Sequence, residues 1–457
     1  MARDTLDETP IENRDQLVAT LEVGCKPKDR WRIGTEHEKF GFYFKDNTPV
    51  PYEGERGIKA LLQGMESLLG WEPIIDNDNI IGLYDATGGG AISLEPGGQF
   101  ELSGAPLENL HQTCREVHSH LAQLREVAEP MGMRFLGVGA SPLWSFDETP
   151  KMPKSRYDIM RNYMPKVGSK GLDMMHRTST IQVNLDFESE ADMAKKMRVG
   201  LALQPIATAV FATSPFLDGK PNGYLSYRSE IWKDVDNDRA GMLPFAFHDG
   251  FGFESYVDWA LDVPMYFLKR GNGYMDVSGL SFRDFMDGKL GDVLPGQTAT
   301  LGDWVNHLST AFPEVRLKTF LEMRGADGGP WRRICALPAF WVGILYDSTS
   351  LNAAWDLVKD WTEEERQTLR DAVPTTGLKT KFRNRSVQEI ARDVVEISQQ
   401  GLKRRAMFNQ EGDDETHFLA PVEETVMFGK TPADQMLEDY RGVWGGDITK
   451  VFEHYAY

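Results

Sequence analysis

Two glutamates, Glu36 and Glu38, lie two residues apart in the segment RIGTEHEKFGFYF. In an extended strand, residues i and i+2 face the same side, so both carboxylates are expected to share a face with Phe40, Phe42 and Phe44. A glutamate on a sheet surface is most often simply solvated. A one-sided pair beside aromatic rings also suits a cation site, and recurrence of the pattern would favour that interpretation.

The pattern recurs in two later segments. ISLEPGGQFELSG supplies Glu95 and Glu101, and FLEMRGADGGPWRR supplies Glu322, each in an apolar, glycine-rich setting. Several acids on one face of an antiparallel sheet would repel one another strongly unless cations neutralise them. Oxygen ligands without a matching Cys or His pattern suit Mg²⁺ or Mn²⁺. We therefore expect a metal site held by Glu36, Glu38, Glu95, Glu101 and Glu322.

Magnesium held by carboxylates commonly serves a nucleotide, because the ion keeps some waters and takes its other ligands from phosphates. The usual phosphate-binding loop is missing. The GK[ST] match is Gly429, Lys430 and Thr431, and Glu424 stands where such a loop needs its first glycine. A nucleotide would have to be held by other groups.

Arginines in similar segments are candidates for that role. Arg177 lies in MHRTSTIQVN, Arg228 in YLSYRSEIW and Arg324 in MRGADGGPWRR. A guanidinium group binds carboxylates or phosphates through two parallel hydrogen bonds. For any one arginine a surface ion pair explains the residue equally well. Together with the acids, they suit a site that handles ATP and an acidic substrate.

The elements that carry these residues follow from local patterns. Strict alternation of polar and apolar residues in TSTIQVNLDF predicts a strand with one core face and one polar face. Glycine-rich turns in IIGLYDATGGGAISLEPGGQFELSG predict an antiparallel meander. VRLKTFLEMRGADGGPWRR is expected to form another strand, with Lys318, Phe320, Glu322 and Arg324 on one face.

Helices are expected between and after these strands. Asn13 caps a helix at about 13–23, further helices cover about 190–215 and 254–268, and Ser386 with Glu389 forms a capping box. The longest uncharged run, 199–217, approaches bilayer length but contains Gln204 and two prolines, which favours a buried helix.

Composition limits the classes of function. The chain has 457 residues, of which 41% are hydrophobic, enough for a sizeable core. A net charge of -19 argues against binding nucleic acid or an anionic membrane.

Three scattered cysteines, Cys25, Cys114 and Cys335, allow at most one disulfide, and Cys335 is expected to be a free buried thiol. The first residues resemble neither a secretory signal nor a transit peptide, so a cytoplasmic location is expected.

Seven long strings resemble the plant-type glutamate-cysteine ligases, which also occur in proteobacteria. They are RIGTEHEKFGF, ISLEPGGQFELSG, RYDIMRNYMP, RTSTIQVNLDF, YLSYRSEIW, GFGFESYVDWALDVPMYF and FLEMRGADGGPWRR. The resemblance runs from about residue 30 to the C-terminus. It implies an α+β fold in which a glutamine-synthetase-like, curved antiparallel sheet forms a funnel flanked by helices. We expect a single catalytic domain over 1–457, with a mostly helical part at about 350–457.

The resemblance implies the first step of glutathione biosynthesis. ATP, L-glutamate and L-cysteine would give γ-glutamylcysteine, ADP and phosphate through a γ-glutamyl phosphate, with Mg²⁺ or Mn²⁺ as cofactor. Carried over to this sequence, Glu36 and Glu38 are the firmest metal ligands and also count as catalytic. Arg228 would bind a substrate carboxylate or phosphate, and Arg324 a nucleotide phosphate.

Four further residues are expected to bind substrate, namely Gln182, Asn184, Arg177 and Tyr163. For Gln182 and Asn184, hydrogen bonds between strands explain the residues equally well. Tyr157, Arg161 and Tyr163 would close over the site, or else form an ordinary helix surface at its rim.

Two alternative functions are compatible with the sequence. One is another ATP-dependent ligase of the same fold that joins glutamate to a different amine, because an apolar pocket separates near-isosteres only weakly. The other is an inactive nucleotide-binding homologue, which the presence of all five acids opposes. Feedback inhibition by glutathione is expected, redox control is not carried over, and the lack of a leader favours a bacterial cytoplasmic enzyme. The sequence does not indicate an oligomeric state.

Overall fold

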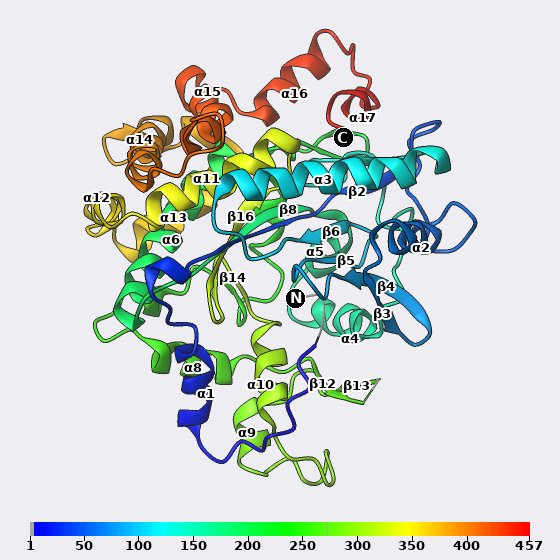
Figure 1. Cartoon of the computed structure of the whole chain (residues 1–457), viewed down its shortest axis with the longest axis vertical. Helices are drawn as coiled ribbons and strands as arrows, with labels where there is room; N and C mark the ends of the chain where they lie inside the picture. Colours follow the sequence, from blue (N-terminus) through cyan, green and yellow to red (C-terminus); the bar gives the residue numbers. More distant parts are fainter. Residues whose placement is uncertain (1–3, 272) are drawn as a thin grey trace.

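An eight-stranded antiparallel sheet lies at the centre of the computed structural model, which describes residues 4–271 and 273–457 (Figure 1). The strand order is β15-β16-β8-β1-β6-β5-β4-β3. The strands are β1 Ile33–His37, β3 Glu72–Asp76, β4 Asn79–Tyr84, β5 Ala91–Leu94, β6 Phe100–Ser103, β8 Thr180–Leu185, β15 Val315–Leu317 and β16 Leu321–Asp327. In this order β1 is central, and Glu36 pairs with Ser103 on one side and Gln182 on the other.

One face of the sheet forms the main hydrophobic core. Ile181, Val183 and Leu185 of β8 are buried there, which confirms the alternation expected for this strand. Three long helices cover this face, namely α3 Leu110–Ala128, α6 Glu190–Val210 and α11 Trp331–Leu345. Figure 1 shows α3 and α11 crossing above the sheet. Helix α6 is buried along nearly its whole length, as expected of a core helix.

The C-terminal helices form a further layer on α6 and α11. They are α12 Ser348–Val358, α13 Glu363–Thr376, α14 Val387–Arg405, α15 Ala420–Phe428, α16 Pro432–Arg441 and α17 Lys450–His454. Helix α14 begins with the capping box expected for Ser386 and Glu389. In Figure 1 the orange and red helices lie beyond α11. Apolar side chains of α12 to α15 extend the same core that β8 and α6 build.

Smaller elements complete the fold around the sheet and its long helices. The remaining helices are α1 Arg14–Glu22, α2 Ile58–Leu69, α4 Ser155–Tyr163, α5 Gly171–Arg177, α7 Tyr227–Ile231, α8 Phe253–Asp262, α9 Phe282–Met286 and α10 Leu301–Leu308. The short strands pair as β2 Phe40–Tyr43 with β7 Met133–Leu136, β9 Phe216–Leu217 with β10 Lys220–Pro221, β11 Ala240–Gly241 with β14 Phe312–Pro313, β12 Phe267–Arg270 with β13 Gly273–Asp276, and β17 Lys381–Phe382 with β18 Arg385–Ser386.

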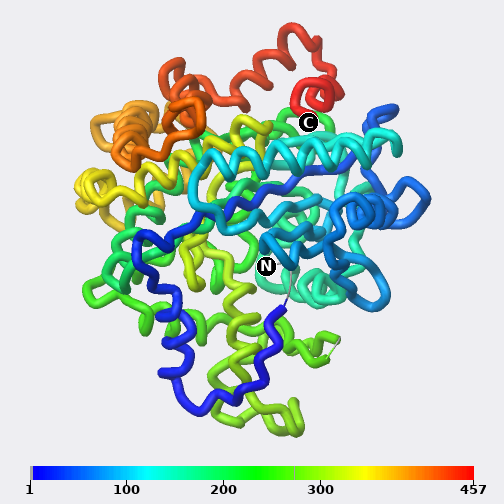
Figure 2. Tube along the Cα trace, in the orientation of Figure 1, coloured from blue at the N-terminus to red at the C-terminus, as the bar shows by residue number. Residues whose placement is uncertain are grey.

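The N-terminal segment lies alongside residues near 300. Figure 2 shows this blue tube running next to the green one. The backbone N–H of Thr5 donates to Asn306 Oδ1 at 2.9 Å, and that of Ile11 donates to the Ala299 carbonyl at 2.9 Å. Helix α1 then begins with the cap expected at Asn13.

The first strand ends earlier than its sequence suggests. It stops at His37, and Phe40–Tyr43 forms the separate strand β2, so the expectation that Glu36 and Glu38 share a face with the three phenylalanines is wrong. Lys39 lies between the two strands, and its buried Nζ donates to the Phe100 carbonyl at 3.0 Å. Phe40 and Phe42 pack into a second apolar cluster, and Phe44 is half exposed.

The segment 315–333 also differs from its expected single strand. It folds as the hairpin β15–β16, which places Arg316 directly opposite Glu322. The expected helix over 254–268 ends at Asp262, because Pro264 disfavours the helical conformation of the residue before it.

Within the described residues, no single helix is long and apolar enough to cross a bilayer. The helices α11 and α12 pass such a test only as a pair bent by 88°.

Candidate active site

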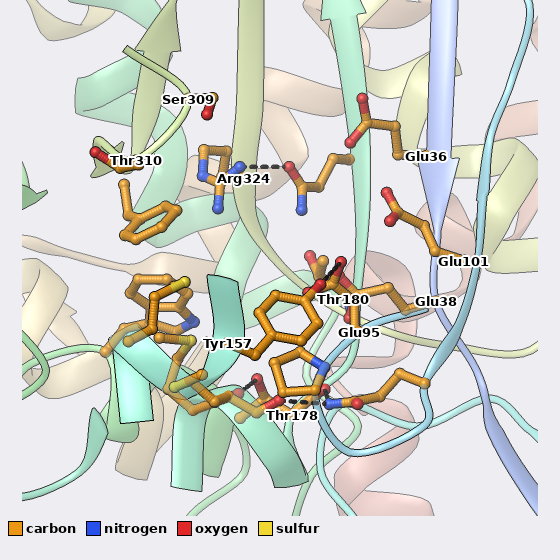
Figure 3. Close-up of a pocket in the computed structure, with 18 of the residues that line it drawn as sticks. Glu36, Glu38, Glu95, Glu101, Tyr157, Thr178, Thr180, Ser309, Thr310 and Arg324 are labelled. Atoms are coloured by element: carbon orange, nitrogen blue, oxygen red, sulfur yellow. Dashed lines mark hydrogen bonds between the residues drawn. The ribbon is translucent and has the colours of Figure 1, made fainter. Parts of the chain in front are cut away.

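A pocket on the polar face of the sheet brings together four of the five expected metal ligands. Glu36, Glu38, Glu95 and Glu101 line it, and Figure 3 shows them gathered on one side, with Arg324 across the cavity. Glu36 belongs to β1 and Glu101 to β6, which are neighbouring strands. The pocket is therefore acidic on one wall and basic on the other.

A tight turn presents Glu95 to the pocket. The Glu95 N–H donates to the Gln99 carbonyl at 2.9 Å, and Gly98 adopts a φ of +83° that favours glycine. At Gly97 a side chain would collide with the His176 carbonyl, because a Cβ would lie only 2.2 Å from that oxygen. The sequence EPGGQ therefore has the glycines that this turn requires.

Each pocket carboxylate is oriented by one or two hydrogen bonds from the protein. Asn184 Nδ2 donates to Glu36 at 2.8 Å, the Thr180 N–H donates to Glu38 at 3.1 Å, and the Tyr157 hydroxyl donates to Glu95 at 3.2 Å. Glu101 accepts from the hydroxyls of Ser93, at 2.5 Å, and Ser103, at 3.1 Å. A carboxylate can accept about four hydrogen bonds, so lone pairs remain for a ligand.

Burial and mutual repulsion weaken the ionised forms of these acids. Burial raises the pKa of Glu36, and the charges of Glu322 and Glu101 raise it further. Burial also raises the pKa of Glu38 well above its usual value, with Glu95 and Glu101 adding to the shift. Arg228 and Arg324 act in the opposite direction on Glu38. The cluster is therefore short of positive charge, and a bound cation would relieve the repulsion.

The opposite wall is arginine-rich. Arg228 lies in α7, whose N-cap Ser226 donates to Asp327 at 2.7 Å and fixes the start of the helix. Arg228 Nη2 donates to the Arg324 carbonyl at 3.0 Å, and Arg324 Nη1 donates to Gln182 Oε1 at 2.8 Å. The second of these bonds is drawn in Figure 3. Gln182 therefore lines the pocket and also orients Arg324.

Both guanidinium groups lie beside an aromatic ring. Their central carbons are 5.8 Å and 6.0 Å from the centroid of the Trp232 ring, within the range of cation–π attraction. Planar cations held in this way can meet the oxygens of a carboxylate or phosphate in pairs.

Glu322 differs from the other four acids. It lies on the same face of the sheet, opposite Asn184, but it is fully buried and does not line the pocket. Arg316 Nη2 contacts its two oxygens at 2.7 and 2.8 Å, Lys318 contacts it at 3.0 Å, and Arg324 contacts it as well. Although burial opposes it, these cations hold the pKa of Glu322 well below its usual value. In this structure Glu322 is therefore the counter-ion of the basic wall.

Three of the four expected substrate-binding residues do not line the pocket. Asn184 acts through Glu36, as described above. Arg177 contacts Asp173 at 3.2 Å and Asp218, and Tyr163 packs on Tyr266 with ring centroids 5.4 Å apart. Of the residues expected to close over the site, Tyr157 lines the pocket and Arg161 does not.

Several lining residues were not expected from the sequence. Arg156 begins the string RYDIMRNYMP, so its position in that motif was a usable signal. Arg316 had no such signal, because its place opposite Glu322 depends on the hairpin. Thioether and aromatic side chains also line the pocket, namely Met160, Met174, Met175, Trp232, Phe267 and Phe312.

A large antiparallel sheet flanked by helices, with an acidic pocket faced by arginines on its polar side, is the α+β arrangement expected from the sequence. The family model described as Glutamate-cysteine ligase family 2 (GCS2) matches residues 32–454, and the chain belongs to this family. It is 62% identical to a chloroplastic glutamate–cysteine ligase of Nicotiana tabacum, and the match covers 97% of this chain and 83% of that protein. The corresponding enzyme of Arabidopsis thaliana is 60% identical with the same coverage.

A solved structure supports the fold class. Glutamate–cysteine ligase from Francisella tularensis, in complex with AMP, matches with a TM-score of 0.57 at 13% identity. The match covers 92% of this chain and 87% of that one. At this identity the likeness concerns the fold alone, and it confirms the predicted class.

The expected bacterial, cytoplasmic location is contradicted by the relatives. Those at 58–62% identity are plant enzymes described as chloroplastic.

Proposed function

We propose that this protein is an ATP-dependent ligase that joins the γ-carboxylate of L-glutamate to the amine of L-cysteine. The products are γ-glutamylcysteine, ADP and phosphate, and the reaction is the first step of glutathione biosynthesis. The observation that carries the proposal is the pocket itself, in which four glutamates face Arg228 and Arg324 in a chain 62% identical to a glutamate–cysteine ligase. A carboxylate is a poor acyl donor, so ligation requires its activation by phosphoryl transfer.

The acidic wall fits a hard divalent cation. Its donors are carboxylate oxygens, which Mg²⁺ and Mn²⁺ prefer, and their raised pKa values indicate uncompensated negative charge. Among the described residues, no three of these carboxylates bring oxygens within 4.8 Å of one another. In this arrangement one ion would contact at most two of Glu36, Glu38, Glu95 and Glu101 and would take its other ligands from water and phosphate oxygens, as Mg²⁺ commonly does. Such an ion would offset charge on the transferring phosphoryl group.

The basic wall has the complementary role. Arg228 and Arg324 can hold glutamate and the γ-phosphate of ATP in line, so that a γ-carboxylate oxygen attacks phosphorus and ADP leaves. The cysteine amine then attacks the γ-carbonyl of γ-glutamyl phosphate. The resulting oxyanion lies next to fixed positive charge, and its collapse expels phosphate. Gln182 keeps Arg324 in place throughout, and Glu322 neutralises the basic wall when no substrate is bound.

A direct assay tests the proposal. The full chain is incubated with ATP, Mg²⁺ and L-glutamate, with and without a panel of amines that includes L-cysteine and 2-aminobutyrate. ADP and the products are then quantified by mass. We expect ADP to form in step with γ-glutamylcysteine, with the highest kcat/KM for cysteine, and glutathione to inhibit because it contains both parts of the product. ADP formation with another amine alone would overturn the choice of substrate, and no turnover with any amine would overturn the ligase.

Acid variants link this activity to the pocket. Glu38→Gln should lower turnover by about 10²–10³-fold, whereas Glu126→Gln, which changes an exposed glutamate on α3, should leave it unchanged. Equal activity in the two variants would separate the reaction from the acidic wall.

A further inference from the structure

A buried carboxylate, Asp327, lies behind the basic wall of the pocket. It is the last residue of β16, three residues after Arg324, and it is buried without lining the pocket. One of its oxygens accepts from the Thr213 N–H at 2.8 Å and the Ser214 hydroxyl at 2.7 Å. The other accepts from the Ser226 hydroxyl at 2.7 Å. Both oxygens are therefore bonded within the protein, and Asp327 does not contact a ligand in the pocket.

These hydrogen bonds fix the start of α7, the helix that carries Arg228. Ser226 is its N-cap, and the Ser226 hydroxyl also accepts from the Ser229 N–H at 3.2 Å. The Ser214 hydroxyl accepts from the Arg228 N–H at 3.2 Å. Because both hydroxyls donate to Asp327, this carboxylate orients the two oxygens that receive the first N–H groups of the helix. A helix of five residues is too short to be stable alone, so its direction depends on such contacts.

The charge of Asp327 also supports Arg228. Burial lowers the pKa of Arg228, and the charge of Asp327 is the largest influence that opposes this shift, ahead of that of Glu38. The Arg228 guanidinium donates to the carbonyl of Arg324, which belongs to the same strand as Asp327. One strand therefore holds Arg324 directly and Arg228 through Asp327.

The same region is joined to the acidic wall. The Ser179 hydroxyl donates to the Glu38 carbonyl at 3.0 Å, and the Gly328 N–H donates to the Ser179 carbonyl at 2.8 Å. A Cβ at Gly139 would lie only 2.4 Å from the carboxyl carbon of Asp327, so this close approach requires glycine. Asp327 is thus held between the backbone of Glu38 and the start of α7.

We propose that Asp327 is a positioning residue that sets the distance and direction of Arg228 relative to the acidic wall. The proposal rests on the proposed function, in which Arg228 binds an anionic group of the substrate. A guanidinium group forms paired hydrogen bonds only in a narrow geometry, and a misplacement of about 1 Å in a site can cost about 100-fold in rate. Asp327 acts on the reaction through Arg228 and not by contact with the substrate.

The variant Asp327→Asn tests this role in the full chain. It keeps the size of the side chain but removes the charge and places an N–H donor among the donors of Thr213, Ser214 and Ser226. We expect the KM for L-glutamate, and the Kd for L-glutamate in calorimetry, to rise about tenfold, as for the loss of one hydrogen bond to a charged group. Asp347→Asn is the matched control. Asp347 caps α12 through its side chain but does not line the pocket, so this variant should bind glutamate as the wild type does.

A double-mutant cycle separates positioning from a purely structural role. In the Arg228→Lys background the paired hydrogen bonds are already lost, so Asp327→Asn should raise the KM for glutamate by less than about twofold more. A purely structural defect would act equally in both backgrounds. Ser214→Ala keeps the charge of Asp327 and removes one anchor of Arg228, and it carries the test if Asp327→Asn does not fold. Its KM for glutamate should rise about threefold.

The outcomes distinguish this proposal from the ligase itself. Unchanged glutamate affinity in folded Asp327→Asn, an unchanged KM in Ser214→Ala, or equal effects of Asp327→Asn in both backgrounds would each overturn the role of Asp327. No turnover in the wild type would overturn the ligase instead, and the Kd values for glutamate would then decide the role of Asp327 alone.

Discussion

Replacing Glu322 by Gln tests whether this residue is a counter-ion or a metal ligand. The substitution keeps the shape of the side chain but removes the negative charge that Arg316, Lys318 and Arg324 share. Glu322 is 0% exposed, so water cannot replace the lost charge. The variant would leave three buried cations around a neutral amide.

The expected cost follows from this burial. Removing one partner of a buried ion pair typically destabilises a protein by about 3–5 kcal/mol. Unfolding entropy is about 2.1 cal/mol/K per residue near 60 °C, which gives about 1 kcal/mol/K for 457 residues. If unfolding is two-state, Tm should therefore fall by about 3–5 °C. The folded-state pKa of Glu322 is lowered, so its stabilisation is present above its unfolded value of 4.5 and is lost as the pH falls through the folded value.

Calorimetry near neutral pH measures this effect. The wild type and Glu322→Gln are compared with Glu126→Gln as a surface control and with Glu36→Gln as a pocket acid. Glu36→Gln should keep or raise Tm, because it removes a repelled, buried charge. An unchanged Tm in Glu322→Gln, together with a higher Mg²⁺ requirement for activity, would refute the counter-ion assignment and make Glu322 a metal ligand.

Three further substitutions test the pocket and its surroundings. Glu38→Gln should lower kcat by about 10²–10³-fold at saturating Mg²⁺. Its Tm should not fall, because burial and the nearby acids already oppose the charge of Glu38. Normal turnover in steady-state kinetics would contradict this prediction. Arg228→Lys keeps the charge but loses the paired hydrogen bonds, so the KM for glutamate should rise, and a change confined to ATP would reassign the residue. Burial raises the pKa of Glu116 from 4.5 to about 7, so its protonated form stabilises the fold below pH 4.5 and this contribution is lost as the pH rises through 7. The loss of stability amounts to about 3 kcal/mol at most. Glu116→Gln can still accept the hydrogen bond of the Ala105 N–H, and denaturant titrations of this variant should lack this pH dependence. If the free energy of unfolding still changes with pH as in the wild type, another group causes the dependence.

Features that depend on a few neighbouring residues could be predicted from the sequence. The cap at Asn13, the capping box at Ser386 and the alternation along β8 each require only local hydrogen bonds or one buried face. The two strand errors have a different origin. The break between β1 and β2 falls at Lys39, whose buried side chain binds the Phe100 carbonyl about 60 residues away, and periodicity alone carries no information about such a partner.

The same difference between local patterns and long-range contacts explains which residues of the candidate site could be predicted. Glu36, Glu38, Glu95 and Glu101 were found because each lies in a distinctive local string, and all four line the pocket. Arg316 was missed because it reaches Glu322 only across a hairpin that was expected to be one strand. Arg177 and Tyr163 belong to equally distinctive strings, but their side chains contact other residues outside the pocket. Without the fold, such residues cannot be distinguished from those that line the pocket.

Isotope transfer from labelled glutamate tests the central claim most directly. The full chain is supplied with L-glutamate that carries ¹⁸O in its γ-carboxylate, together with ATP, Mg²⁺ and L-cysteine, and the released phosphate is analysed by mass. If the pocket activates glutamate as γ-glutamyl phosphate, one ¹⁸O atom should move from each glutamate into phosphate. Formation of γ-glutamylcysteine with unlabelled phosphate would contradict the mechanism, because the γ-carboxylate would then not have attacked ATP.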